Sequence, residues 1–246
     1  MRRRENQFKL TSVMKRLNRY LLEPINTLTH LVAAVTACIV LLPLLHRAAH
    51  DLPKWMSLLV FGLSMIILYL SSALLHGLKV SPKRRIWLNR VDHMAIFLLI
   101  AGTYTPIVYN LFPTAWRWRV LLPVWLVALV GMGVKLLNRR IHGFYHTTIY
   151  LILGWGSVLP FWMATNLFET IPHRDFALLL LGGLIYTVGF FVYYFQWPDP
   201  WPEWFGHHEI WHLFVMGGSV CHYLFMFWVV VPFARETAVI SFPFLL

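Results

Sequence analysis

The sequence predicts an all-α membrane protein, folded as a seven-transmembrane helix bundle. Of its 246 residues, 59% are hydrophobic and only 13% are charged, whereas a soluble domain is about 45–50% apolar and about 25% charged. The apolar residues also gather into seven stretches of the roughly 20 residues that a helix needs to cross a bilayer. Because these stretches use most of the chain, we expect one membrane domain and no second folded domain.

The expected helices divide the chain into an arm, a bundle and a tail. The seven helices are expected near residues 28–46, 56–77, 92–112, 119–137, 146–165, 176–196 and 208–232. Residues 1–27 then form a basic N-terminal arm, residues 28–232 the transmembrane domain and residues 233–246 a short tail. In the arm, apolar residues recur at helical spacing from Leu10 to Leu22 with basic residues on the other face. This pattern favours an interfacial helix on anionic phospholipid headgroups over a solvated tail.

The basic residues predict the orientation of the bundle. If the segments outside the seven helices alternate between the two sides of the membrane, 15 of the 21 Lys and Arg residues lie on the side of the N-terminus and 6 on the other. Basic residues concentrate on the cytoplasmic side of a membrane protein. We therefore expect a cytoplasmic N-terminus and an external C-terminus. The same distribution accounts for the net charge of +11, so we expect no nucleic-acid partner.

Four polar clusters interrupt the apolar helices, and all four fall at the cytoplasmic end. They are Glu23-x2-Asn26-x3-His30, Ser72-x3-His76, Asp92-His93 and His208-x3-His212. Ionisable residues inside a membrane are costly and usually functional. A count of six helices would scatter the clusters between the two leaflets. Their convergence therefore supports seven helices and predicts one polar site near the cytoplasmic face.

The histidines and the carboxylate in these clusters suit a catalytic zinc site with one open position. His208 and His212 are one turn apart, so they share a helix face, and His76 from a separate helix would complete three ligands. Asp92 is better suited to hold the bound water and accept its proton. Ser72, one turn before His76, would hydrogen-bond the attacked carbonyl oxygen or the water.

A third group of polar residues is expected to support the metal ligands. The spacing of Glu23, Asn26 and His30 places them on one face of the first helix. Histidines that bind metals usually need a partner for the second ring nitrogen, and these three residues are candidates. His142 and His146 are a rival pair of ligands at helical spacing, but they lie in a basic loop with no acidic residue nearby.

Three of these motifs resemble the signature motifs of the progestin and adipoQ receptor family: Glu23-x2-Asn26-x3-His30, Ser72-x3-His76 and His208-x3-His212. The runs at 92–97 and 101–106, with the His-Glu-Ile-Trp-His motif at 208–212, look like its bacterial branch, the hemolysin III proteins. The resemblance extends from residue 23 to about residue 230. It implies a seven-helix fold with an intracellular zinc centre, in which His76, His208 and His212 bind zinc, Asp92 orients its water and Ser72 lines the site.

The resemblance also implies a class of chemistry, because the superfamily includes alkaline ceramidases and adiponectin receptors with ceramidase-like activity. We therefore expect an integral protein of the bacterial inner membrane that uses zinc to hydrolyse a lipid amide or ester from the cytoplasmic leaflet. The alternative is a membrane sensor, or a membrane-homeostasis protein, whose zinc is structural and whose fourth coordination position is closed by the protein. A pore-forming hemolysin fits less well, because no expected helix carries a continuous polar stripe. The sequence predicts neither the substrate nor the oligomeric state.

Overall fold

The computed structural model describes residues 13, 15–137, 143–156, 173–202 and 204–235. Its main elements are the helices α2 (Pro24–Arg47), α3 (Leu52–Gly77), α4 (Pro82–Leu111), α5 (Thr114–Leu137), α6 (Gly143–Trp155), α9 (His173–Phe195) and α10 (His207–Phe225). A π-helix at Met226–Val230 directly follows α10. The predicted all-α class is confirmed for the described part of the chain.

Six helices in the described part are long and apolar enough to cross a membrane: α2, α3, α4, α5, α9 and α10 with its π-helical end. Helix α6 lies at the start of the span expected at 146–165, and the rest of that span falls outside the described residues. A membrane protein is therefore supported, whereas the seventh span and the orientation remain predictions. Most of the predicted N-terminal arm and of the tail also lies outside the described residues.

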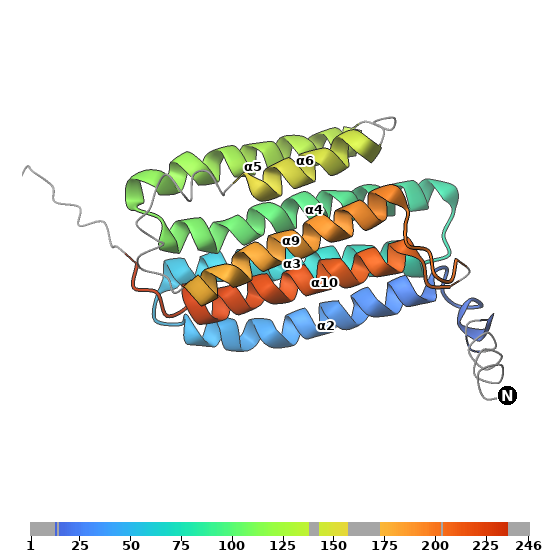
Figure 1. Cartoon of the computed structure of the whole chain (residues 1–246), viewed down its shortest axis with the longest axis horizontal. Helices are drawn as coiled ribbons and strands as arrows, with labels where there is room; N and C mark the ends of the chain where they lie inside the picture. The colour runs from blue at the N-terminus through green and yellow to red at the C-terminus, as the bar shows by residue number, and fades with distance from the viewer. Residues whose placement is uncertain (1–12, 14, 138–142, 157–172, 203, 236–246) are drawn as a thin grey trace, which may run out of the picture.

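The helices form a closed ring. Helix α2 packs on α3, α3 on α4, α4 on α5 and α6, α6 on α9, α9 on α10, and α10 again on α2. Figure 1 shows these helices lying side by side along the long axis of the molecule. Helices α2, α4 and α10 begin, and α3 ends, at one end of the bundle, which we call the site end. The opposite end, where α3 begins and the π-helix finishes, is called the far end. All four predicted polar clusters lie at the site end.

Proline and a capping aspartate mark where the first helices begin. Pro24, Pro53 and Pro82 each occupy the first or second position of α2, α3 or α4, where a helix needs no backbone N–H and the fixed φ of proline fits. Asp51 caps α3, since its carboxylate accepts a hydrogen bond from the Lys54 backbone N–H at 3.1 Å. These helix starts fix where α2, α3 and α4 begin along the bundle.

Helix α4 differs most from the sequence prediction, because it begins at Pro82 rather than near residue 92. Its first ten residues include four cations (Lys83, Arg84, Arg85 and Arg90). Hydropathy marks the part of a helix that lies in hydrocarbon and misses a polar extension of the same helix. The earlier start adds nearly three turns, which brings basic side chains of α4 to the site end.

The interior of the bundle is packed with large side chains from different helices. Leu44 of α2, Phe61 of α3, Phe97 of α4 and Phe225 of α10 are all at most 1% exposed. Leu126 of α5, by contrast, belongs to a face of large apolar side chains that is more than half exposed. Such a face is stable against lipid tails rather than water, which agrees with a membrane location.

Candidate metal centre

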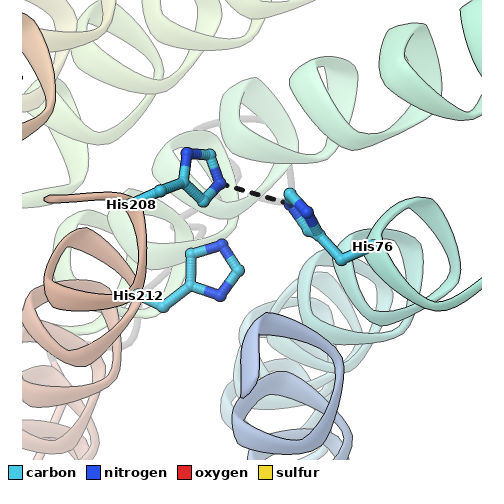
Figure 2. Close-up of side chains that lie close together, drawn as sticks. All are labelled: His76, His208 and His212. Atoms are coloured by element: carbon cyan, nitrogen blue, oxygen red, sulfur yellow. Dashed lines mark hydrogen bonds between the residues drawn. The ribbon is translucent and has the colours of Figure 1, made fainter. Parts of the chain in front are cut away.

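Three imidazoles from two helices converge at the site end (Figure 2). His76 lies in the last turn of α3, and His208 and His212 lie one turn apart at the start of α10. One nitrogen from each ring can be chosen so that all three lie within 4.8 Å of one another. His76 and His212 are buried, whereas His208 is partly exposed. This is the group of side chains in the described part of the chain that could hold a metal ion.

The spacing of one pair of ring nitrogens matches that of two ligands on a shared cation. The Nε2 atoms of His76 and His208 are 3.3 Å apart, as the dashed line in Figure 2 marks. Two nitrogens bound to one tetrahedral zinc ion at about 2.0–2.1 Å are separated by roughly 3.3–3.4 Å. Glu23 lies 2.5 Å from Nδ1 of His76, so the proton of this ring is held at Nδ1 and the Nε2 lone pair faces His208. A carboxylate on the second ring nitrogen is a usual companion of a metal-binding histidine.

Glu23 is the centre of a polar network that joins four helices. Its carboxylate contacts His76 of α3, accepts a hydrogen bond from Asn26 of α2 at 3.1 Å and pairs with Arg85 of α4 at 3.0 Å. Asn26 also donates to Glu209 of α10 at 2.9 Å. Burial alone would raise the pKa of the Glu23 carboxyl, but the hydrogen bond and charge of His76, together with Asn26, outweigh it and lower the pKa to about 2. Glu23 is therefore ionised at neutral pH and can hold its four-helix network together.

The start of α10 is fixed by two carboxylates. Glu209 accepts a hydrogen bond from the Gly206 backbone N–H at 2.8 Å, and Asp199 accepts one from the His207 backbone N–H at 3.1 Å. Backbone N–H groups in the first turn of a helix have no partner within the helix, and acidic groups stabilise them. These bonds hold the turn that carries His208.

His30 supports the centre through its ring face. It stacks on His212 with ring centroids 3.7 Å apart and planes inclined by 9°, and it meets Tyr69 edge to face at 5.1 Å. Both ring nitrogens of His30 are buried and have no hydrogen-bond partner in the described part of the chain. Of the three residues expected to contact a ligand's ring nitrogen, Glu23 does so, Asn26 holds Glu23, and His30 stacks instead.

Asp92 and Ser72 lie beside the three imidazoles. Asp92 of α4 has a side chain that is 15% exposed, and its carboxylate lies close to the buried Ser72 of α3. Asp92 does not belong to the group of converging ligand atoms, so its position suits a proton acceptor better than a ligand. Ser72 was expected to hydrogen-bond a carbonyl oxygen or a water, and its neighbour in the structure is Asp92.

A large cavity opens from this centre into the bundle. Its volume is about 1150 Å³, slightly above the roughly 300–1,000 Å³ of usual small-molecule pockets. Glu23, Asp92 and the three imidazoles line it at the site end. Its walls beyond them are mainly apolar and include Leu68, Ile96, Leu99, Ile100, Leu179 and Phe190. The cavity therefore joins a polar, metal-competent end to a long apolar chamber.

Two residues at the centre were not predicted from the sequence. Arg85 forms the ion pair with Glu23 described above, and the Tyr193 ring of α9 lies 5.6 Å from the His208 ring. Arg85 precedes Asp92 by seven residues, which places both on one face of a helix, so extending the helix before residue 92 would have found it. Tyr193 carries no such signal. Of the rival pair, His142 and the His146 side chain lie outside the described part of the chain.

Comparison with known proteins gives consistent results. The family model described as Haemolysin-III related matches residues 18–223. Hemolysin-3 of Bacillus cereus is 34% identical over 229 residues, covering 92% of this chain and 100% of that protein. The Hemolysin-3 homolog of Bacillus subtilis (strain 168) is 34% identical over 212 residues, covering 85% and 95%. Monocyte to macrophage differentiation factor of Homo sapiens is 30% identical over 206 residues, covering 80% of each chain.

These matches and the apolar helices agree. Six helices of spanning length and the bacterial relatives identify an integral membrane protein of the bacterial plasma membrane. The matched region includes every residue of the metal centre. The chain therefore belongs to the haemolysin-III-related family, the bacterial hemolysin III branch of the progestin and adipoQ receptor superfamily.

Proposed function

We propose that this protein is a zinc-dependent hydrolase of a lipid amide or ester, and that it works from the cytoplasmic leaflet. One observation carries the proposal: three converging imidazoles and a separate carboxylate line the same end of a mainly apolar cavity. A cavity of this kind suits a ligand with a long hydrocarbon chain and a polar end. The bond to be cleaved would then lie at the imidazoles while the chain occupies the apolar part.

The residues divide the chemistry between them. A zinc ion held by His76, His208 and His212 would supply a Lewis acid for the carbonyl and lower the pKa of the attacking water. Asp92 accepts a proton from that water and returns it to the leaving nitrogen or oxygen as the carbonyl carbon–heteroatom bond breaks. Ser72 donates to the Asp92 carboxylate and keeps it oriented. Glu23 fixes the tautomer of His76.

The test is lipid turnover by the purified full-length protein in detergent micelles. A fluorescent ceramide serves as the amide probe and a fluorescent phosphatidylcholine as the ester probe. We expect Asp92→Asn and His212→Ala to lower the rate on the preferred probe by about 100- to 10,000-fold. Val35→Ala, on an exposed part of α2, should leave it unchanged. Chelation should abolish turnover and added zinc should restore it. Equal rates for all the variants would contradict the proposal.

A second candidate function comes from the names of the Bacillus relatives, which are called hemolysins. Lysis would require the protein to permeabilise a bilayer. Release of an encapsulated dye from liposomes containing the protein measures this directly. We expect no release above that of empty liposomes; dye release that persists in Asp92→Asn would favour lysis over hydrolysis. Zinc that stays bound with no turnover of any lipid would favour the sensor alternative.

A further inference from the structure

A second polar cluster lies deeper in the bundle, away from the metal centre. Tyr186 of α9 and Ser219 of α10 share a hydrogen bond of 2.8 Å, and Tyr69 of α3 lies close to Ser219. The ring of His222, one turn beyond Ser219, lies 5.5 Å from the Tyr186 ring. This deep polar cluster, Tyr69, Tyr186, Ser219 and His222, connects three helices inside a membrane, where polar side chains are costly unless they are paired or used.

His222 lies in a notch beside the cavity, which it lines together with Tyr186. A side chain at Gly182 of α9 would overlap the His222 ring, so the glycine makes room for it. The ring lies near the backbone carbonyl of Leu179. An imidazole has two ring nitrogens, so that carbonyl can satisfy only one of them, and no described side chain is hydrogen-bonded to the other.

The neighbouring polar side chains of the cavity wall have partners of their own. Thr103 donates to the Leu99 carbonyl and Thr187 to the Gly183 carbonyl, both at 2.7 Å. The Tyr104 hydroxyl donates to the Leu153 carbonyl at 2.7 Å. The Tyr186–Ser219 pair is explained by the packing of α9 on α10. One ring nitrogen of His222, by contrast, borders a cavity whose neighbouring polar side chains already have partners. A ligand group that hydrogen-bonds there would remove the cost of that nitrogen.

We propose that His222 recognises a hydroxyl or keto oxygen carried within the acyl chain of the lipid that occupies the cavity. The proposal rests on the proposed function only in placing the polar end of that lipid at the three imidazoles. His222 follows His212 by ten residues of one helix, which separates them by about 15 Å. Carbon–carbon bonds of about 1.5 Å zigzag at the tetrahedral angle, so each bond advances an extended chain by less than its own length. A span of about 15 Å therefore corresponds to about a dozen carbons. The favoured ligand is therefore a lipid hydroxylated near its twelfth carbon.

The test compares three fatty acids in equilibrium binding to the full-length Asp92→Asn protein, which should retain the cavity without turnover. The probes are octadecanoic acid and the same acid hydroxylated at its twelfth or its second carbon. We expect the twelfth-carbon hydroxyl to tighten binding by about three- to tenfold, the effect of one net hydrogen bond, and the second-carbon hydroxyl to give no such gain. Ethanolamides of the same acids distinguish an amide-linked chain from a free acid. Equal affinity for the plain acid and the acid hydroxylated at the twelfth carbon would overturn the proposal, as would no binding of any of them.

Variants localise the effect within the deep polar cluster. His222→Leu should bind plain octadecanoic acid as the parent does and lose the preference for the twelfth-carbon hydroxyl. Tyr186→Phe should keep most of the preference, because its hydroxyl already bonds to Ser219. Val220→Leu, on the exposed side of the same helix, is the matched control. A preference that survives in a folded His222→Leu protein would assign recognition elsewhere. Selective binding without turnover by the native chain would contradict the hydrolase while supporting this site.

Discussion

The two ends of the bundle both hold charged side chains, yet they use them differently. At the far end, the Lys54 ammonium donates to the carbonyls of Val231 and Phe233 at 2.9 and 2.7 Å. Arg235 pairs with Asp51 at 2.9 Å. Protein oxygens thus accept hydrogen bonds from both cations, and these bonds clamp the start of α3 to the segment after α10. We call this set the far-end clamp.

At the site end, by contrast, hydrogen bonding is incomplete at the imidazoles. The Nε2 atoms of His76 and His208 are 3.3 Å apart and can share one hydrogen bond. Both ring nitrogens of His30 and Nδ1 of His212, however, are buried with no hydrogen-bond partner among the described residues. The contrast teaches that polar groups inside a membrane mark a functional site where imidazole nitrogens converge without partners, and a structural joint where each cation contacts an oxygen acceptor.

The largest effect should come from opening the far-end clamp with Lys54→Met. The lysine is 6% exposed, and its loss leaves two carbonyls without their charged donor. We expect the free energy of unfolding to fall by about 2–4 kcal/mol, seen as a melting temperature lower by about 5–10 °C in detergent. Zinc content should stay the same, as measured by elemental analysis after purification. Loss of zinc without loss of thermal stability would show that the two ends are not separate in this way.

Glu23→Gln probes the site end with a change that keeps the size of the side chain. The amide cannot hold the proton of His76 at Nδ1 as a carboxylate does, so we expect zinc affinity to fall by about 10- to 100-fold. Competition with a chromogenic chelator measures this. The matched control is Asp51→Asn, which also neutralises a carboxylate paired with an arginine, but at the far end. It should lower the melting temperature and leave zinc affinity unchanged. An equal loss of zinc affinity in both variants would show that the affinity follows the stability of the whole fold rather than the Glu23–His76 contact.

Sequence reasoning succeeded where the physics is local. A lipid environment forces apolar runs, so the helix expected at 28–46 is found at Pro24–Arg47. The pitch of a helix places His208 and His212 on one face before any fold is known. The start of α4 was missed because its first turns are polar, and composition reports contact with lipid rather than helical structure. The orientation of the bundle remains a prediction.

The contacts between helices could not be foreseen from the sequence. The bond between Asn26 and Glu209 and the stacking of His30 on His212 depend on the rotation and tilt of α2 against α10. These are set by packing along the whole of both helices rather than by any motif. Motif spacing therefore predicted which residues would gather at the site end, and left open which atoms would meet.

The smallest effects should separate the two arginine–carboxylate pairs. Arg235 has a side chain that is 11% exposed, whereas that of Arg85 is 38% exposed. Solvent screens an exposed pair and leaves it worth about 0.2–1 kcal/mol. We therefore expect Arg235→Gln to lower the melting temperature measurably and Arg85→Gln to change it by less. Thermal melts of both variants in the same detergent test this order. The reverse order would mean that Arg85 and Glu23 contribute to folding as the far-end clamp does, which would remove the distinction between a structural joint and a site.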